Sequence, residues 1–173
     1  MKHLFLIFSL FILSVSALAQ SQNIGVGVSA IYNFQTESFG AGARVSIFPN
    51  ERLSIVPQAS YYPSFNKVEE YLLGLGLEYK FIKRERINFY VLGQGAYNSW
   101  NSYEKSEKKG AKLNNWNAEL GLGVSTNTCL RPFLEYRYNF KFYETHLQLG
   151  VLWIFGCRDC NKHSVDRCAA YFK

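Results

Sequence analysis

The segment from Arg131 to Phe142, RPFLEYRYNFKF, constrains the possible folds most strongly, because apolar and polar residues alternate along it. Successive side chains of a β-strand point to opposite faces, so this alternation predicts a strand with one apolar and one charged face. Phe133 is the one apolar residue on the charged side. If the apolar face is buried, the chain is a soluble sandwich or a lipocalin-like barrel. If the charged face is buried, the apolar face must contact lipid.

The same alternation recurs along the chain and predicts eight strands. Seven further stretches show it: residues 24–34, 39–47, 53–61, 71–81, 87–98, 116–125 and 145–155. Eight successive strands with short connections predict an all-β, antiparallel up-and-down barrel, and eight is the smallest usual number for a membrane barrel. After the N-terminal segment no stretch is long and apolar enough for a membrane helix, so insertion into a membrane would have to use strands.

Glycine indicates which face is inside. Nine glycines share the face that carries the charged residues: Gly25, Gly27, Gly40, Gly42, Gly74, Gly76, Gly121, Gly123 and Gly150. A water-exposed strand face gains nothing from glycine, whereas the lumen of an eight-stranded barrel is too narrow for large side chains at every inward position. The charged face is therefore predicted to be the interior.

The strand at residues 87–98 does not fit this rule. Gly93 and Gly95 share a side with Phe89 and Val91, whereas Gln94 lies opposite. We expect either a bulge in this strand or an inward position for Phe89 and Val91.

Aromatic residues make up 17% of the chain and cluster toward strand ends on the predicted outer face, as at Tyr61, Tyr79 and Tyr136. Amphipathic rings at both ends of an apolar band are typical of bilayer interfaces. The alternative is the core of a soluble, lipocalin-like ligand carrier, which would stay in solution without detergent. Such a core would not need so many tyrosine hydroxyls near its edges.

Residues 1–19 have the pattern of a secretory signal peptide, in which Lys2 and His3 precede an apolar run from Leu4 to Val15 and a small-residue end at Ala19. We therefore predict a signal peptide at 1–19, a barrel at 20–155 and a short cysteine-containing tail at 156–173. Short connections are expected at 49–52, 83–86 and 126–128, and longer ones, such as 99–114, at the opposite end. This asymmetry predicts periplasmic N and C termini.

The chain combines a signal peptide, eight alternating strands, G-x-G pairs and a last strand that ends in Val151, Trp153 and Phe155. In these features it resembles the small outer-membrane barrels of the OmpX and OmpA-transmembrane-domain type, in the form common in Bacteroidota. The resemblance covers residues 23–155 and implies a cell outer-membrane location among lipid. It also implies that Trp153 and Phe155 form the signal read by the barrel-assembly machinery. The chain departs from the family by continuing for residues 156–173.

The predicted interior carries charges of both signs, which can pair across a narrow lumen. The expected network comprises Arg44, Glu78, Glu119, Arg131, Glu135 and Arg137. Such a network predicts a plugged barrel, with a conducting pore as the alternative.

No chemistry is predicted for the barrel. His146 and Glu144 have no convincing nucleophile or paired carboxylate beside them in the predicted barrel, so we expect no enzyme and no cofactor. The G-x-G pairs open no helix after a strand, and the run at 104–112 mixes charge signs without interleaved aromatics, so no nucleotide or nucleic-acid binding is expected.

The four cysteines are expected to gather at the periplasmic end, because a turn near Phe142 and Tyr143 would place Cys129 opposite residue 156 or 157. An exported chain with an even cysteine count favours disulfides. The first choice pairs Cys129 with Cys157 and Cys160 with Cys168. A zinc site from Cys157, Cys160, Cys168 and either His163 or Cys129, or a redox-active pair, stays open.

These features predict a non-enzymatic outer-membrane barrel with a structural or surface-interaction role. The tail favours a second possibility, an accessory subunit of a cell-envelope assembly or secretion complex that binds a periplasmic protein through residues 156–173.

Overall fold

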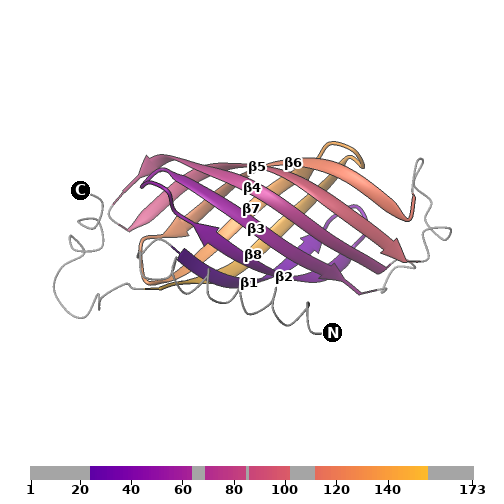
Figure 1. The fold of residues 1–173 in the computed structure, drawn as a ribbon, viewed down its shortest axis with the longest axis horizontal. Coiled ribbons are helices and arrows are strands. Elements are labelled where there is room, and N and C mark those ends of the chain that lie inside the picture. The colour runs from indigo at the N-terminus through magenta and orange to yellow at the C-terminus, as the bar shows by residue number, and fades with distance from the viewer. Residues whose placement is uncertain (1–23, 64–68, 85, 102–111, 156–173) are drawn as a thin grey trace, which may run out of the picture.

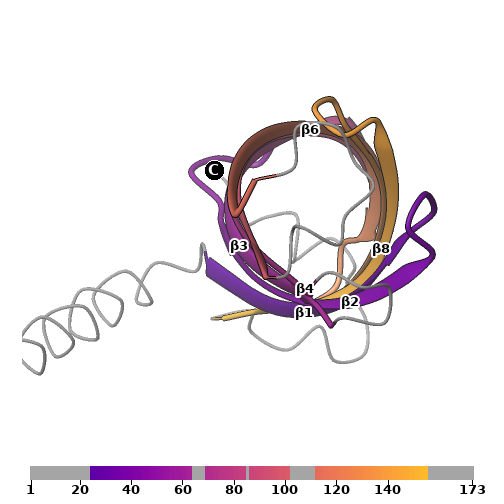
Figure 2. The same cartoon turned by 90° about the vertical axis from the view of Figure 1, so that its right-hand side faces the viewer.

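The structure, a computed structural model, describes residues 24–63, 69–84, 86–101 and 112–155 and forms one closed barrel of eight antiparallel strands (Figure 1). Each strand pairs with the next, and β8 pairs with β1 to close the ring (Figure 2). The strands are β1 (Ile24–Asn33), β2 (Ser38–Ile47), β3 (Leu53–Tyr62), β4 (Glu69–Lys83), β5 (Ile87–Asn101), β6 (Asn114–Thr126), β7 (Leu130–Asn139) and β8 (Glu144–Ile154). The predicted barrel is confirmed. The described residues contain no helix that is long and apolar enough to cross a membrane.

The two ends of the barrel differ in their connections. The turn end carries residues 48–52, 84–86 and 127–129, together with the start of β1 and the end of β8. The loop end carries residues 34–37, 63–68, 102–113 and 140–143. The longest connections thus lie at the end opposite the termini of the barrel.

The wall is apolar outside and polar inside, as the glycine pattern predicts. Leu75, Leu122 and Leu149 are 60%, 61% and 59% exposed, whereas Arg137 and Glu119 are 2% and 6% exposed. A continuous apolar outer surface of this kind is the opposite of a soluble barrel, in which the leucines would be enclosed.

In β5 both predicted alternatives are wrong. The strand pairs with β6 in continuous register, and Phe89 points outward. Gly93 and Gly95 also face outward, where an added Cβ would meet nothing within 4 Å. The interior positions are instead occupied by side chains that include Tyr90 and Leu92, both buried. Glycine on this strand does not mark the inner face, because the large inward residues of β5 fill space that glycines on β4 and β6 leave free.

Two of the hairpins at the loop end share one turn geometry. In each, the last asparagine of a strand accepts hydrogen bonds from two loop amides: Asn33 from Gln35 and Thr36, and Asn139 from Lys141 and Phe142. Such Asx turns compete with strand pairing and end the strand. The fourth loop residue, Glu37 or Tyr143, then has a positive φ of 49° or 56°.

This turn shortens the seventh strand relative to the prediction, which extended it to Phe142. The strand ends at Asn139, and Phe142 lies in the turn, where its ring packs on Trp100 at 4.7 Å between centroids. The register also shifts. Leu130 pairs with Trp153, and the amide of Ile154 donates to the carbonyl of Cys129 at 2.9 Å. Cys129 therefore lies opposite Ile154 rather than opposite 156 or 157.

Two irregularities interrupt the ladders. Pairing between β2 and β3 is missing between the pairs Arg44–Gln58 and Ile47–Ile55. Pro57 lies in this gap and has no N–H to donate. The register of β4 against β5 shifts between Lys80 and Ile82, as expected for a β-bulge.

Candidate functional site

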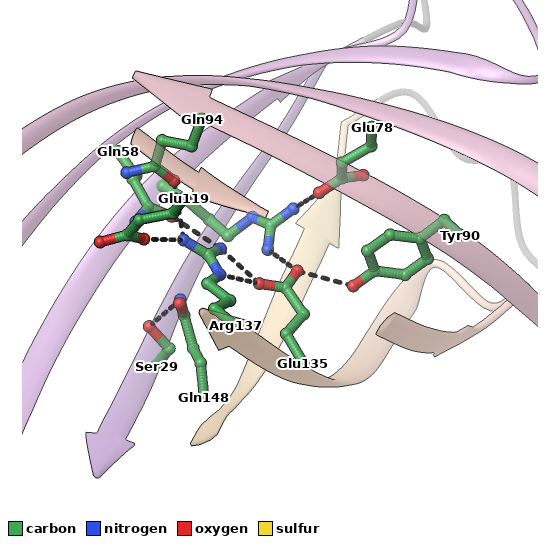
Figure 3. Close-up of polar contacts among 10 residues, drawn as sticks. Ser29, Gln58, Glu78, Tyr90, Gln94, Glu119, Glu135, Arg137 and Gln148 are labelled. Carbon is green, nitrogen blue, oxygen red and sulfur yellow. Dashed lines mark hydrogen bonds and ion pairs between the residues drawn. The ribbon is translucent and has the colours of Figure 1, made fainter. Parts of the chain in front are cut away.

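The centre of the lumen is built around the carboxylate of Glu135 on β7. Its Oε1 accepts hydrogen bonds from Arg44 Nη1 at 2.5 Å and from the hydroxyl of Tyr90 at 2.6 Å. Its Oε2 accepts from Arg137 Nε at 2.8 Å and also bonds Arg137 Nη2. Glu78 pairs with the same Arg44 guanidinium. Glu135 thus joins an arginine from β2 to Arg137 on its own strand, and Figure 3 shows the contacts of Glu135 with Arg137 and Tyr90.

Arg137 extends this arrangement toward β3 and β5. Its Nη1 donates to Gln94 Oε1 at 2.7 Å, and its Nη2 donates to Gln58 Oε1 at 3.0 Å. Glu119 lies 3.9 Å from Nη1, and all of these side chains are buried. A guanidinium has five N–H donors in a fixed plane, which explains how one residue can contact three strands at once.

All eight strands supply polar side chains to this level of the lumen. We call them the central network: Ser29, Arg44, Gln58, Glu78, Tyr90, Gln94, Glu119, Glu135, Arg137 and Gln148. Within it, Gln148 bonds Ser29 Oγ at 2.8 Å and so joins β8 to β1. Hydrogen bonds between distant strands can form because the wall is closed, so that inward side chains of all strands point toward the same barrel axis.

Five of the six predicted charged residues come together in the central network, and Arg131 does not. Arg131 lies toward the turn end, where its guanidinium carbon is 5.5 Å from the ring centroid of Phe48. The structure shows no hydrogen bond or ion pair for its side chain among the described residues. Sequence reasoning placed Arg131 inside by parity, but parity does not give the distance along the barrel axis.

The turn end of the lumen is lined by apolar residues, of which the sequence analysis singled out only Phe133, as the apolar exception on its charged face. Phe48, Phe133, Leu152 and Ile154 form a buried cluster. The inward position of three of them could have been predicted from the sequence, because Phe133, Leu152 and Ile154 alternate in phase with inward residues of β7 and β8. The exceptional Phe133 of the charged face is therefore an interior residue, and the Arg44 guanidinium stacks on its ring at 4.4 Å.

The loop end of the lumen combines asparagines with ionisable side chains such as Glu144 and His146. The hydroxyl of Tyr62 lies 3.0 Å from His146 Nδ1, and His146 Nε2 lies 3.7 Å from Glu144. Several asparagines surround this level, and all are buried: Asn33, Asn98, Asn115, Asn117 and Asn139. Asparagine satisfies both donors and acceptors without charge, so it suits a confined polar space.

The predicted assembly signal lies at the turn end of the wall. Trp153 and Phe155 both face outward, and the amide of Phe155 donates to the carbonyl of Ile24 at 2.9 Å. The backbone just after β8 is thus held against the start of β1, at the seam that closes the barrel. Recognition by the assembly machinery stays a prediction.

Predictions about the tail fall largely outside the described residues. Cys129 is the one described cysteine and is not a free thiol. Cys157, Cys160, His163 and Cys168 lie outside the described residues, so their pairing, a zinc site and binding of a periplasmic partner stay predictions. Within the described part of the chain, no group of three or more His, Cys, Asp and Glu side chains is placed to hold a metal ion.

Comparison with known proteins gives similarity in fold alone. No protein-family model matches the chain, and no curated protein sequence matches it. Among solved structures, the N-terminal β-barrel domain of Pseudomonas aeruginosa OprF is similar with a TM-score of 0.58 and 17% identity, over 76% of this chain and 96% of that one. The chain has the fold of the small eight-stranded outer-membrane barrels.

Two further structures share this outer-membrane barrel fold. A de novo designed transmembrane β-barrel has a TM-score of 0.52 and 13% identity, over 76% of this chain and 94% of the design. The outer membrane enzyme PagL has a TM-score of 0.51 and 9% identity, over 75% of this chain and 98% of PagL. The fold therefore occurs in a designed barrel as well as in an enzyme, and function has to be argued from the side chains of this chain.

Proposed function

We propose that this chain is an integral outer-membrane protein with a non-enzymatic, structural or surface-interaction role and a closed lumen. The observation that carries the proposal is the inverted burial of the wall, with leucines such as Leu75 outside and Arg137 buried at the centre. Lipid is the only solvent in which such an outer face is stable, because in water it would be a large exposed apolar patch.

The barrel is proposed to place its turn end in the periplasm and its loop end outside the cell. Short turns at the periplasmic end and longer extracellular loops are usual in bacterial outer-membrane barrels. The connections described above have this asymmetry, with 84–86 and 127–129 at one end and 102–113 at the other. Surface interactions would then involve the loop end.

Two layers of the lumen support a closed barrel. The central network links opposite walls through Arg44, Glu135 and Arg137, and the phenylalanines Phe48 and Phe133 lie on the turn side of it. An ion crossing this level would have to displace charge-assisted hydrogen bonds and an apolar layer, both of which are costly. We expect no sustained conductance when the refolded barrel is placed in a planar lipid bilayer.

The absence of catalysis is also a proposal, supported by the position of the one histidine of the barrel. His146 is buried inside and contacts Tyr62 and Glu144. A lipid substrate would approach along the outer face of the wall, from which this imidazole is separated by the strands. A lipid-modifying reaction at His146 would need the substrate to enter the lumen.

Fractionation is the experiment that tests the proposed function. The full chain, expressed with its N-terminal segment in a Gram-negative host, is expected in outer-membrane fractions and to resist extraction by carbonate. Folded barrels also run faster than heated ones in detergent gels, so the unheated protein is expected to show a mobility shift. A chain that stays in solution without detergent would instead be the soluble carrier, and stepwise conductance would reject the closed lumen.

A further inference from the structure

The turn half of the lumen contains more positive charge than its carboxylates balance. From the central network to the turn end, the cations inside the lumen are Arg44, Lys80, Arg131 and Arg137, and the carboxylates are Glu78, Glu119 and Glu135. The half-buried Glu51 belongs to the turn and is paired with the exposed Lys83, so that pair adds no net charge. With every group ionised, four positive charges face three negative ones. Buried charge is costly unless it is paired, and within the described residues one unit of positive charge has no counter-ion.

Of these four cations, Lys80 and Arg131 have no carboxylate partner among the described residues. Lys80 Nζ donates to the main-chain carbonyl of Glu51 at 3.3 Å, while the Glu51 carboxylate binds Lys83 at 2.6 Å. Both cations lie over the ring of Phe48, at 4.9 Å for Lys80 and 5.5 Å for Arg131. A cation–π contact contributes about 0.5–2 kcal/mol and does not neutralise the charge.

These cations meet at a small cavity between the Phe48 and Phe133 rings. Its lining includes Arg44, Lys80 and Arg131, with Ser125 and the single carboxylate Glu78. The cavity volume of about 10 Å³ corresponds to one water-sized sphere. Arg44 Nε and Arg131 Nε are both buried and have no hydrogen-bond partner within the described part of the chain, and the Arg44 side chain is more than nine-tenths buried. The space is therefore electropositive, donor-rich and large enough for one small particle.

We propose that this cavity binds a single halide ion, chloride in the cell, which neutralises Lys80 and Arg131 and stabilises the turn half of the barrel. The cavity is too small for phosphate or a carboxylate ligand, so a monatomic anion is the class that fits. The terminal groups of Lys80 and Arg131 have rotatable stems that can adjust by a few tenths of an ångström. Arg131 is only half-buried, so an ion can enter from the turn end.

Bromide provides the direct test, because it replaces chloride and scatters anomalously. Crystals of the full chain in detergent, grown or soaked in sodium bromide, are expected to show an anomalous peak in the cavity, within contact distance of Arg131 and Lys80. The same peak is expected to be absent from Arg131→Met crystals. Wild-type crystals with no bromide peak in the cavity would show that it holds water at most, and that result overturns the proposal.

Stability in different anions gives a second test that does not need crystals. The midpoint of the heat-induced gel-mobility shift is measured in sodium chloride and in sodium gluconate at equal ionic strength. We expect chloride to raise the wild-type midpoint by roughly 2–5 °C, because a ligand that binds only the folded state stabilises it. The difference is expected to disappear in Arg131→Met and in Lys80→Met, and to persist in Lys83→Met, which removes a surface cation outside the cavity.

An equal chloride effect in Lys80→Met and wild type would indicate a general salt effect and reject the site. If Arg131→Met does not fold, Lys80→Met and the wild-type bromide crystals decide the question. Neither test depends on the proposed role of the protein. A conducting barrel could still bind the ion, and a closed barrel could lack it.

Discussion

Gly95 on β5 and Gly123 on β6 lie on neighbouring strands but on opposite faces of the wall. A Cβ added to Gly95 would meet nothing within 4 Å, whereas one added to Gly123 would collide with the ring of Tyr90. The same residue type is thus sterically required on the inner face and optional on the outer one. The comparison shows that an added methyl group has open space on the outer face at Gly95 and meets a neighbouring side chain on the inner face at Gly123.

The two faces also differ in how their residues are stabilised. Inside, a residue such as Glu135 depends on particular partners from other strands, because any unpaired charge there is expensive. Outside, a residue such as Leu122 needs only to be apolar, because lipid adapts to its shape. The loss of stability caused by a substitution should therefore depend on the particular contacts of the residue on the inner face. On the outer face it should depend mainly on the polarity of the new side chain.

The largest effect is expected from Glu135→Ala, which breaks the inner face at its centre. Removing this carboxylate leaves Arg44 and Arg137 each without a main partner, and we expect the free energy of unfolding to fall by about 3–5 kcal/mol. Urea or guanidinium unfolding in detergent micelles measures the change. Glu51→Ala, which removes the half-exposed pair with Lys83, is the matched control and should cost about 0–1 kcal/mol. Equal losses in the two variants would contradict a specific role for the network.

Leu122→Arg tests the outer face. An arginine at the middle of the lipid-facing band is expected to destabilise the folded barrel by about 2–4 kcal/mol in liposomes, because its charge must enter hydrocarbon. Leu130→Arg lies at the turn end of the wall, where the loss should be about 0–1 kcal/mol. Similar values for both variants would argue that no hydrocarbon band surrounds the wall.

Gly27→Ala and Gly95→Ala compare the faces with one substitution. At Gly27 the new Cβ would lie 2.7 Å from the carbonyl oxygen of Val151, a backbone atom of β8 that cannot move aside, and we expect a loss of about 1–3 kcal/mol. At Gly95 the methyl group has open space, and the gain in strand preference should stabilise by about 0.5–1 kcal/mol. Unfolding in micelles measures both. A destabilising Gly95→Ala would show that something in the membrane occupies this surface closely.

The smallest effect is expected at a turn residue, whose side chain contacts neither the lumen nor the lipid-facing band. Glu37 is exposed and has a φ of 49°, a conformation that glycine adopts more easily than other residues. Glu37→Gly should raise the free energy of unfolding by roughly 0.5 kcal/mol, whereas Glu37→Ala should leave it nearly unchanged. If alanine stabilises as much as glycine, the loss of the glutamate side chain and not the backbone conformation is responsible.

Local alternation was sufficient to predict the strands and their faces. Pairs such as Leu75 with Gly76, or Leu122 with Gly123, report which way each residue points, because a strand has a period of two. The prediction failed where that period was read from glycine alone, at β5, and where an asparagine side chain ended a strand early, at Asn139. A turn that begins two residues sooner also moved Cys129 in register against β8.

Taken alone, the order of residues determined that eight alternating segments form a closed wall with polar groups inside, because strand periodicity and side-chain volume are local properties. Only the tertiary structure decided which inward residues meet. Glu135 contacts Arg44 and Tyr90 across the lumen, whereas Arg131 lies apart over Phe48. The reason is that contacts across a barrel depend on strand stagger and axial height, which arise when the ring closes and are not encoded in the alternation of any one strand.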